Sequence, residues 1–454
     1  MNKKKLGTFI SDNIVTLIFV AFIIFGFAVS TETVSFDWFL TELSNRFYRN
    51  AFLVLSLIIP VVAGLGMNFG IVVGAIAGQL SIIFVRYMQM GNLWGFQNLS
   101  GIMAFLLCLL IALPIAMLIG WLVGLLYNKT RGQEMIASLI VGYFGNGVYQ
   151  FIILFAVGAI IPVIKDHPMI LTDGIGVRMS LDMGNIMYSL ENIWQVPFHI
   201  FMTIAGVLVL VYLIVKQYVI PPKPGKSRMH KVKFFALCFV CLLVAGVCGY
   251  YWVMSGKLAN EPDKLANLFL GDICNVKKVP MFTVLMIALL AIFTQWIMST
   301  KLGQDFRACG QDQHIASSNG IDVDKTRIIA TIISTVLAAW GQVLYLQNTG
   351  TMAVYSAHNQ IGFFAVAAIL VGGASVKKAT ISQAFVGTLL FQSMFILSSG
   401  IGRFMFGQAD TAEYFRTFMV YGVIGLALGL YVWKSNKAKR LALPPKEAKT
   451  DSGK

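Results

Sequence analysis

Long apolar runs separated by short polar segments repeat along the whole chain. A helix that crosses a bilayer needs about 20 mostly apolar residues, and about twelve runs approach that length. The runs lie near residues 14–29, 51–67, 70–85, 102–127, 135–162, 198–219, 234–254, 281–299, 326–346, 361–375, 380–399 and 414–433. Because backbone groups in lipid must be hydrogen-bonded within the protein, we predict an all-α polytopic membrane protein with about 10–12 transmembrane helices. The short runs are candidates for broken or re-entrant helices.

One polar segment, residues 301–325, interrupts this pattern. A turn between helices needs only a few residues, so a segment of this length is expected to carry structure. Residues 303–309 can form two helical turns, with Gly310 at the left-handed position after them. Asp312 is a good N-cap for a second short helix, which Gly320 would end. We predict that this segment docks on a partner outside the membrane; the alternative is a solvated loop.

Basic residues gather on one side of the predicted membrane. If every run crosses once and the N-terminus is inside, the inside segments are 1–13, 128–134, 216–233, 300–327, 376–379 and 434–454. They hold 24 of the 35 Lys and Arg residues and 8 of the 20 Asp and Glu residues, which leaves 11 and 12 for the other side. Since Lys and Arg mark cytoplasmic loops, both termini are predicted to be cytoplasmic.

The net charge of +15 therefore indicates membrane orientation, and we predict no nucleic-acid partner. The apolar stretch after the first lysines lacks a clear cleavage site, so an uncleaved first span is expected. The basic loop 216–233 is either a contact for anionic lipids or a solvated orientation signal. The tail 434–454 is predicted to be basic and disordered.

The chain lacks the motifs of an enzyme. No P-loop and no nucleophile elbow occur, and the five histidines never pair at metal-ligand spacing. Cys238, Cys241 and Cys248 share one apolar run, where packing is the expected role. We therefore predict no catalytic residue, no metal and no cofactor. Only 12% of the residues are charged, about half the share in soluble domains.

Uncharged polar residues do enter the apolar runs. Asn68 and Phe69 follow a glycine-rich stretch that suggests an interrupted helix, and Gln79 lies further along. Exposing an amide to lipid is costly, so Asn68, Gln79 and also Asn146 are candidates to line a pathway. Gly70, Gly74 and Gly78 share one helix face and fit either close helix packing or such a pathway. Gln342, Tyr345, Gln347 and Asn348 form a further polar set, of which the last three fit either a functional site or the outer membrane surface.

The predicted spans carry few ionisable groups. Between Glu42 and Glu134 there is no Asp or Glu. Proton-coupled carriers rely on ionisable groups within the membrane, so proton coupling is disfavoured. Sodium coupling can use backbone carbonyls alone and stays open.

Three stretches together resemble a known family. Leu302-Gly303, Phe306-Arg307-Ala308-Cys309-Gly310, Ala316 and Gly320-Ile321 form the first, Gly66-Met67-Asn68-Phe69-Gly70 to Gly78-Gln79-Leu80-Ser81 the second, and residues 365–373 the third. They resemble the ribose-permease-like permease subunits of bacterial ABC importers for simple sugars, nucleosides and branched-chain amino acids. The resemblance covers roughly 51–162 and 281–433.

That resemblance implies two related permease halves and several partners. The partners would be ATP-binding cassette ATPase subunits, a second identical or related permease subunit, an extracytoplasmic solute-binding protein or lipoprotein, and membrane lipids. The first stretch would form cytoplasmic coupling helices on the ATPase, with Gly303, Phe306, Arg307, Ala308, Gly310, Ala316 and Gly320 as coupling residues. Asn68, Phe69, Gln79 and Asn146 would line the solute pathway. ATP hydrolysis would belong to the separate subunit.

The chain is accordingly divided into five parts. Residues 1–50 hold a first span and an outside segment, 51–162 the first half, 163–280 an atypical insertion, 281–433 the second half, and 434–454 the tail. The expected location is the bacterial inner membrane. The expected solute is a simple sugar or nucleoside, with a branched-chain amino acid next. The competing hypothesis is a sodium-coupled secondary transporter of a small neutral solute, whose uptake would follow an ion gradient with ATP depleted.

Overall fold

The computed structural model describes residues 14–29, 34–164, 166–218, 231–257, 278–376, 378–408 and most of 410–429. The predicted tail and most of the basic loop 216–233 lie outside these ranges. Within them, eight helices are long and apolar enough to cross a membrane, and two shorter apolar helices accompany them. This confirms the all-α polytopic membrane fold.

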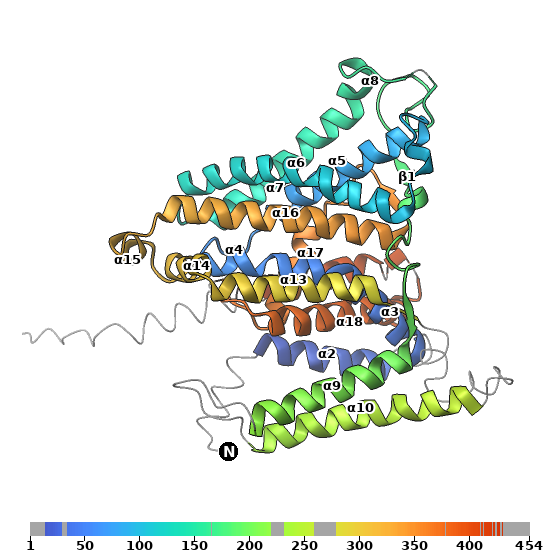
Figure 1. Ribbon diagram of the computed structural model, residues 1–454, viewed down its shortest axis with the longest axis vertical. Helices are drawn as coiled ribbons and strands as arrows, with labels where there is room; N and C mark the ends of the chain where they lie inside the picture. Colours follow the sequence, from blue (N-terminus) through green and yellow to red (C-terminus); the bar gives the residue numbers. More distant parts are fainter. Residues whose placement is uncertain are drawn as a thin grey trace, which may run out of the picture.

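The helices run side by side (Figure 1). The bundle contains α2 (Ile14–Val29), α3 (Phe36–Ser56), α4 (Ile58–Val62), α5 (Ile71–Met90), α6 (Gly101–Lys129), α7 (Glu134–Phe151), α13 (Met281–Ser299), α16 (Val323–Thr349), α17 (Ile361–Val371) and α18 (Ile381–Phe406). A π-helical turn (Ile152–Ala156) and α8 (Val157–Ala159) extend α7. Two short helices, α14 (Lys301–Gln311) and α15 (Gln313–Ser318), lie at one end, which we call the α15 end.

Short antiparallel strand pairs lie at the opposite end, which we call the β1 end. Strand β1 (Ser180–Asp182) pairs with β4 (Thr351–Ala353), and β2 (Gln195–Pro197) pairs with β3 (Lys278–Pro280). Two short 3₁₀ turns, Phe96–Asn98 and Gly184–Ile186, accompany them. The strand pairs hold segments far apart in the sequence together outside the apolar part of the bundle.

Helix α16 is the centre of the bundle and packs on α3, α5 and α6. Gly74 and Gly78 lie one turn apart on α5 and face Thr335 and Ala339 of α16. A Cβ atom at Gly78 would lie 2.5 Å from the carbonyl oxygen of Ala339, so only glycine allows this approach. The packing interpretation is therefore confirmed for Gly74 and Gly78, whereas Gly70 lies at the start of α5 beside Tyr127 and Asn68.

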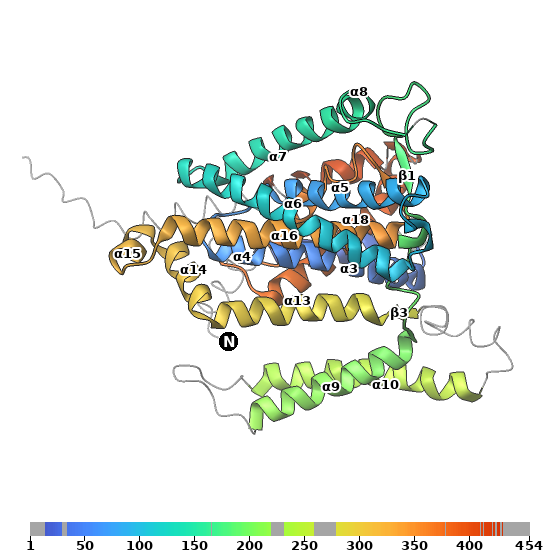
Figure 2. The ribbon, with the colours of Figure 1, turned by 45° about the horizontal axis from the view of Figure 1, so that its top comes forward.

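Helices α9 (Phe198–Tyr218) and α10 (Lys231–Lys257) pack mainly on each other. They form an antiparallel pair at one edge of the molecule (Figures 1 and 2). Strands β2 and β3 connect this pair to the bundle, because β2 leads into α9 and β3 leads into α13. Large apolar side chains are exposed along both helices, as expected for helices that face lipid.

The predicted start of the second span near residue 51 is wrong. Helix α3 begins at Phe36, with the hydroxyl of Ser35 capping the amide of Trp38. Its first half carries charged residues, including an ion pair between Arg46 and Glu42 at 2.7 Å, so it lacks the continuous apolar run that predicts a span. This half lies towards the β1 end, where polar side chains are tolerated.

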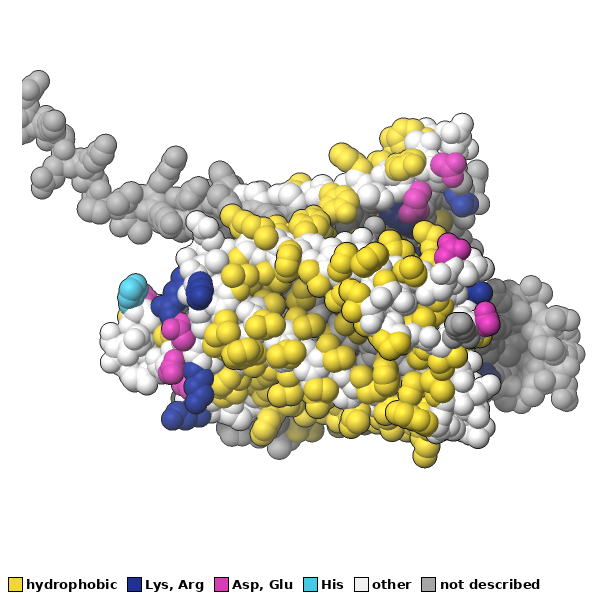
Figure 3. All heavy atoms as spheres, turned by 90° about the horizontal axis from the view of Figure 1, so that it is seen from above, with side chains coloured by type: hydrophobic (Ala, Val, Ile, Leu, Met, Phe, Trp, Pro, Cys, Tyr) yellow, Lys and Arg dark blue, Asp and Glu magenta, His cyan; other side chains and the backbone are white. Residues whose placement is uncertain are grey.

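An apolar belt covers the middle of the surface seen in Figure 3, and charged side chains gather at its two ends. Such a belt is the expected outer face of a bundle in lipid, with charges at the headgroup level. The space-filling view and the helix lengths together support a multi-pass membrane protein.

The close approach of α5 to α16 predicts a position-specific effect of one methyl group. Gly78→Ala is expected to destabilise the protein by about 1–3 kcal/mol, since the new Cβ forces the two helices apart. Gly246→Ala on α10 is the matched control, because nothing lies within 4 Å of its Cβ. Thermal unfolding in detergent should show a lower midpoint for the first variant alone; equal midpoints would contradict the packing.

Candidate functional site

The segment between α4 and α5 is a turn at the α15 end, not a break inside one helix. Gly64 and Gly66 have φ of 80° and 71°, the left-handed region that glycine adopts readily. Asn68 in this turn is 3% exposed, and its Oδ1 accepts hydrogen bonds from the amide of Gly70 (3.0 Å) and the hydroxyl of Tyr127 (2.8 Å). Asn68 thus holds the turn before α5 in place and lines neither of the two cavities described next.

His358 joins two of the predicted pathway residues. It is fully buried in the turn before α17. Its Nδ1 lies 2.5 Å from Oε1 of Gln79 on α5, and its Nε2 lies 2.8 Å from Oδ1 of Asn146 on α7. The ring of Tyr149 packs edge-on against the imidazole, with centroids 4.9 Å apart. A neutral imidazole has one N–H, so one of the two amides must present its NH₂ group to the ring.

A cavity of about 240 Å³ lies beside this cluster, and we call it the α7 cavity. Its lining combines aromatic rings and amides and contains no charged residue. The lining residues are Phe69, Val72, Leu139, Gly142, Tyr143, Asn146, Asn359, Gln360, Gly362, Phe363 and Tyr421. Two predicted pathway residues, Phe69 and Asn146, therefore meet here, while Gln79 reaches the cavity only through His358.

A second cavity of about 190 Å³ shares Gln360 with the α7 cavity. Its other polar lining residues include Asn50, Tyr345 and Gln392. On α16, the amides of Gln342 and Gln347 are fully buried and have no hydrogen-bond partner in the part of the chain that the structure describes. Burying an amide without a partner is costly, so these groups mark a polar interior that extends along α16.

Residues 301–325 form the two short helices predicted for them. Asp312 caps α15 by accepting hydrogen bonds from the amides of His314 and Ile315, and Gly320 has a φ of 80° after the helix end. The predicted role of Gly310 is wrong, because it lies inside α14 and not after it. A Cβ there would lie 2.1 Å from the carbonyl oxygen of Val62, so glycine is needed for contact with α4.

The predicted coupling residues divide into a buried and an exposed set. Gly303, Phe306, Gly310 and Ala316 are buried, Ala308 is half-buried, and Arg307 and Gly320 are exposed. Burial raises the pKa of the neighbouring Cys309 thiol, which fits a packing role. Arg307 donates a hydrogen bond of 2.7 Å to the carbonyl of Met298, which ties α14 to the end of α13.

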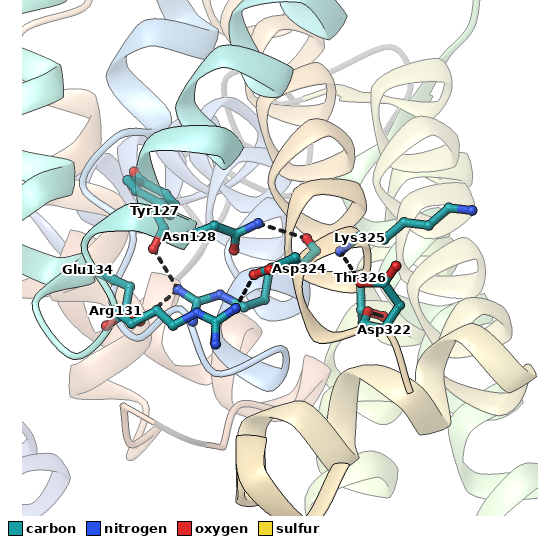
Figure 4. A network of polar contacts seen from close by, with 9 residues as sticks. Tyr127, Asn128, Arg131, Glu134, Asp322, Asp324, Lys325 and Thr326 are labelled. Atoms are coloured by element: carbon teal, nitrogen blue, oxygen red, sulfur yellow. Dashed lines mark hydrogen bonds and ion pairs between the residues drawn. The ribbon is translucent and has the colours of Figure 1, made fainter. Parts of the chain in front are cut away.

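A buried ion pair connects α16 to α7 next to these short helices (Figure 4). Arg327 is 0% exposed, and its Nη2 donates to Oε1 of Glu134 (2.6 Å) and to the carbonyl of Tyr127 (3.0 Å). Nearby, Arg131 pairs with Asp324 at the surface. We call these contacts between the α6–α7 turn and the start of α16 the clasp.

Sequence reasoning missed His358 and the clasp. His358 is an ionisable residue just before an apolar run, and such residues are often functional in membranes, so it could have been noticed. Its partners, Gln79 and Asn146, lie 279 and 212 positions away, which no local pattern reveals.

The clasp predicts unequal effects of single and paired substitutions. Glu134→Gln leaves Arg327 buried without a countercharge and is expected to cost about 3–5 kcal/mol of stability. The double change Arg327→Met with Glu134→Leu removes both charges and should be nearly neutral. Thermal unfolding of both variants in detergent checks this; equal destabilisation by the single and the double change would contradict it.

Comparison with known proteins adds independent information. Residues 39–428 match the family described as branched-chain amino acid transport system / permease component. The chain is 30% identical over 178 residues to the probable ABC transporter permease protein YphD of Escherichia coli (strain K12), an alignment that covers 39% of this chain and 50% of that protein. The chain thus spans about half the length of this relative. No solved structure matches the chain. Since the family match covers most of the chain, this protein belongs to the branched-chain amino acid transport system permease family.

Proposed function

We propose that the chain is the membrane-spanning permease subunit of an ATP-binding cassette importer for a small polar solute. The observation that carries this proposal is the pair of short helices α14 and α15. They project from the α15 end of the bundle and leave Arg307 and Ile315 exposed, the latter by 62%. A large apolar side chain on a polar helix outside the apolar belt fits a docking site for another protein.

The proposed partner at this surface is a separate ATPase subunit. The sequence has no P-loop, so ATP hydrolysis is assigned to that subunit and not to this chain. Because the charge distribution favours a cytoplasmic α15 end, the ATPase would meet α14 and α15 inside the cell. A solute-binding protein would deliver the solute at the β1 end. The proposed location is the bacterial inner membrane, with both termini cytoplasmic.

The proposed solute pathway runs along the α7 cavity. Its aromatic rings and amides suit the apolar faces and hydroxyl groups of a simple sugar or a nucleoside. A branched-chain amino acid is the next choice, because its charged ends would meet no charged lining residue. A second permease subunit, identical or related, would complete the pathway.

The clasp is the proposed link between the docking surface on α14 and α15 and the α7 cavity. It joins the start of α16, which follows the coupling helices, to the start of α7, which carries Asn146. Movement of α14 and α15 on ATP binding would therefore reach the α7 cavity because the clasp makes the packed helices move together.

The coupling surface predicts a charge-reversal effect. Arg307→Glu is expected to abolish uptake, because it removes the bond to Met298 and reverses the charge at the docking surface. Membrane insertion should be unchanged. Lys257→Glu at the exposed end of α10 is the matched control. The assay is ATP-dependent uptake together with co-purification of the ATPase; normal uptake and association in the Arg307→Glu variant would contradict the assignment.

The proposed solute pathway predicts that a substitution in the α7 cavity lowers uptake. Asn146→Leu removes a hydrogen-bond partner of His358 and places an apolar side chain in the α7 cavity, so uptake should fall by about tenfold or more. Phe144→Leu is the control on the same helix, because Phe144 is 71% exposed. Solute uptake into proteoliposomes with the complete transporter measures both. Equal uptake by the two variants would place the pathway elsewhere.

A further inference from the structure

A separate cavity of about 490 Å³ lies at the α15 end between α4, α13, α14 and the segment before α18, and we call it the α13 cavity. It is lined by Ile58, Val62, Thr294, Gln295, Met298, Arg307, Gln311, Lys378, Ala379, Thr380 and Ile381. Two of these residues are basic and none is acidic. Both basic side chains are exposed and lie outside the long apolar helices, Arg307 on α14 and Lys378 between α17 and α18.

The α13 cavity holds a buried polar group without a partner. Thr294 is 1% exposed, and its hydroxyl makes no hydrogen bond within the described ranges. Thr283 on the same helix also lacks a hydrogen-bond partner within the described ranges, whereas Thr331 and Thr335 on α16 donate to the carbonyl four residues earlier. Unlike Thr283, Thr294 lines a cavity, so a ligand in that cavity would give its unpaired hydroxyl a partner.

An apolar groove adjoins this cavity on the outer face of α13. It has a volume of about 420 Å³ and is lined by Ala291, Ile292, Gln295, Trp296 and Ser299, so Gln295 borders both spaces. Ile292 and Trp296 are 65% and 60% exposed on the belt that faces lipid. From Ser299 to Ala291 the groove follows α13 for about 12 Å along the helix axis.

We propose that an anionic phospholipid binds along α13, with its phosphate in the α13 cavity and one acyl chain in the groove. Arg307 and Lys378 supply positive charge, Thr294 and Gln311 supply polar contacts, and the side chains of Ile292 and Trp296 cover the chain. A free phosphate would use the basic cavity but leave the apolar groove unused. A protein partner would have no reason to follow the lipid-facing side of α13.

The test is native mass spectrometry of the full-length protein titrated with phosphatidylglycerol or with phosphatidylcholine of the same acyl chains. The native protein should retain phosphatidylglycerol preferentially. Lys378→Gln should weaken that binding about fivefold, the loss expected for one basic residue near an anionic surface. Lys325→Gln, an exposed lysine at the same end outside the cavity lining, should not change it.

A second variant tests the acyl chain. Ala291→Phe narrows the groove and should weaken binding of both lipids without changing the size-exclusion profile. Equal retention of the two lipids by the native protein, or unchanged retention in Lys378→Gln, would overturn the proposal. If inorganic phosphate displaced the bound species and Ala291→Phe had no effect on binding, the cavity would be assigned to a free anion. Loss of ATPase association in Lys378→Gln without loss of lipid would assign it to a protein contact.

Discussion

The buried ion pair between Arg327 and Glu134 constrains the whole α15 end of the bundle. Removing both charges from water is costly, and the cost is offset only while the two groups remain together. Glu134 is the first residue of α7, and Arg327 lies in the second turn of α16. The carbonyl of Tyr127 at the end of α6 also accepts from Arg327. Three helices are therefore held in one arrangement beside the two short helices.

Uncharged polar groups inside the bundle also need buried partners, although leaving them unpaired costs less free energy than leaving a charge unpaired. His358 bonds to amides of α5 and α7, so the turn before α17 is held between those helices by uncharged groups. This cross-link borders the α7 cavity, where neutral side chains dominate. A site of this kind favours a solute that is recognised by hydrogen bonds and ring contacts, since it offers no ion to pair with a charged ligand.

Much of the fold could be predicted from local patterns. Apolar runs predicted most spans, and Asp312 and Gly320 predicted the boundaries of α15 because caps are encoded within a few residues. The start of α3 was missed because its first half is polar. The place of Gly310 was missed because it depends on contact with Val62, which is distant in the sequence.

In the candidate site, too, local patterns could not predict contacts between residues far apart in the sequence. Phe69 and Asn146 were chosen as polar or aromatic residues in apolar runs and do line one cavity, but Asn68 holds the turn before α5 instead. The cluster around His358 and the pair of Arg327 with Glu134 depend on contacts between residues about 200 or more positions apart. The predicted division of the chain at residues 162 and 280 stays a prediction, and the family match runs through it.

The central claim is that the short helices and α7 move together through the clasp. The most direct measurement is the distance between spin labels at Ser318 on α15 and Phe144 on α7, both exposed, in the assembled transporter with and without ATP. In the native protein we expect the same distance with and without ATP. In the Arg327→Met, Glu134→Leu variant we expect a distance that changes when ATP is added. An ATP-dependent change of that distance in the native protein would show that the clasp does not transmit the movement.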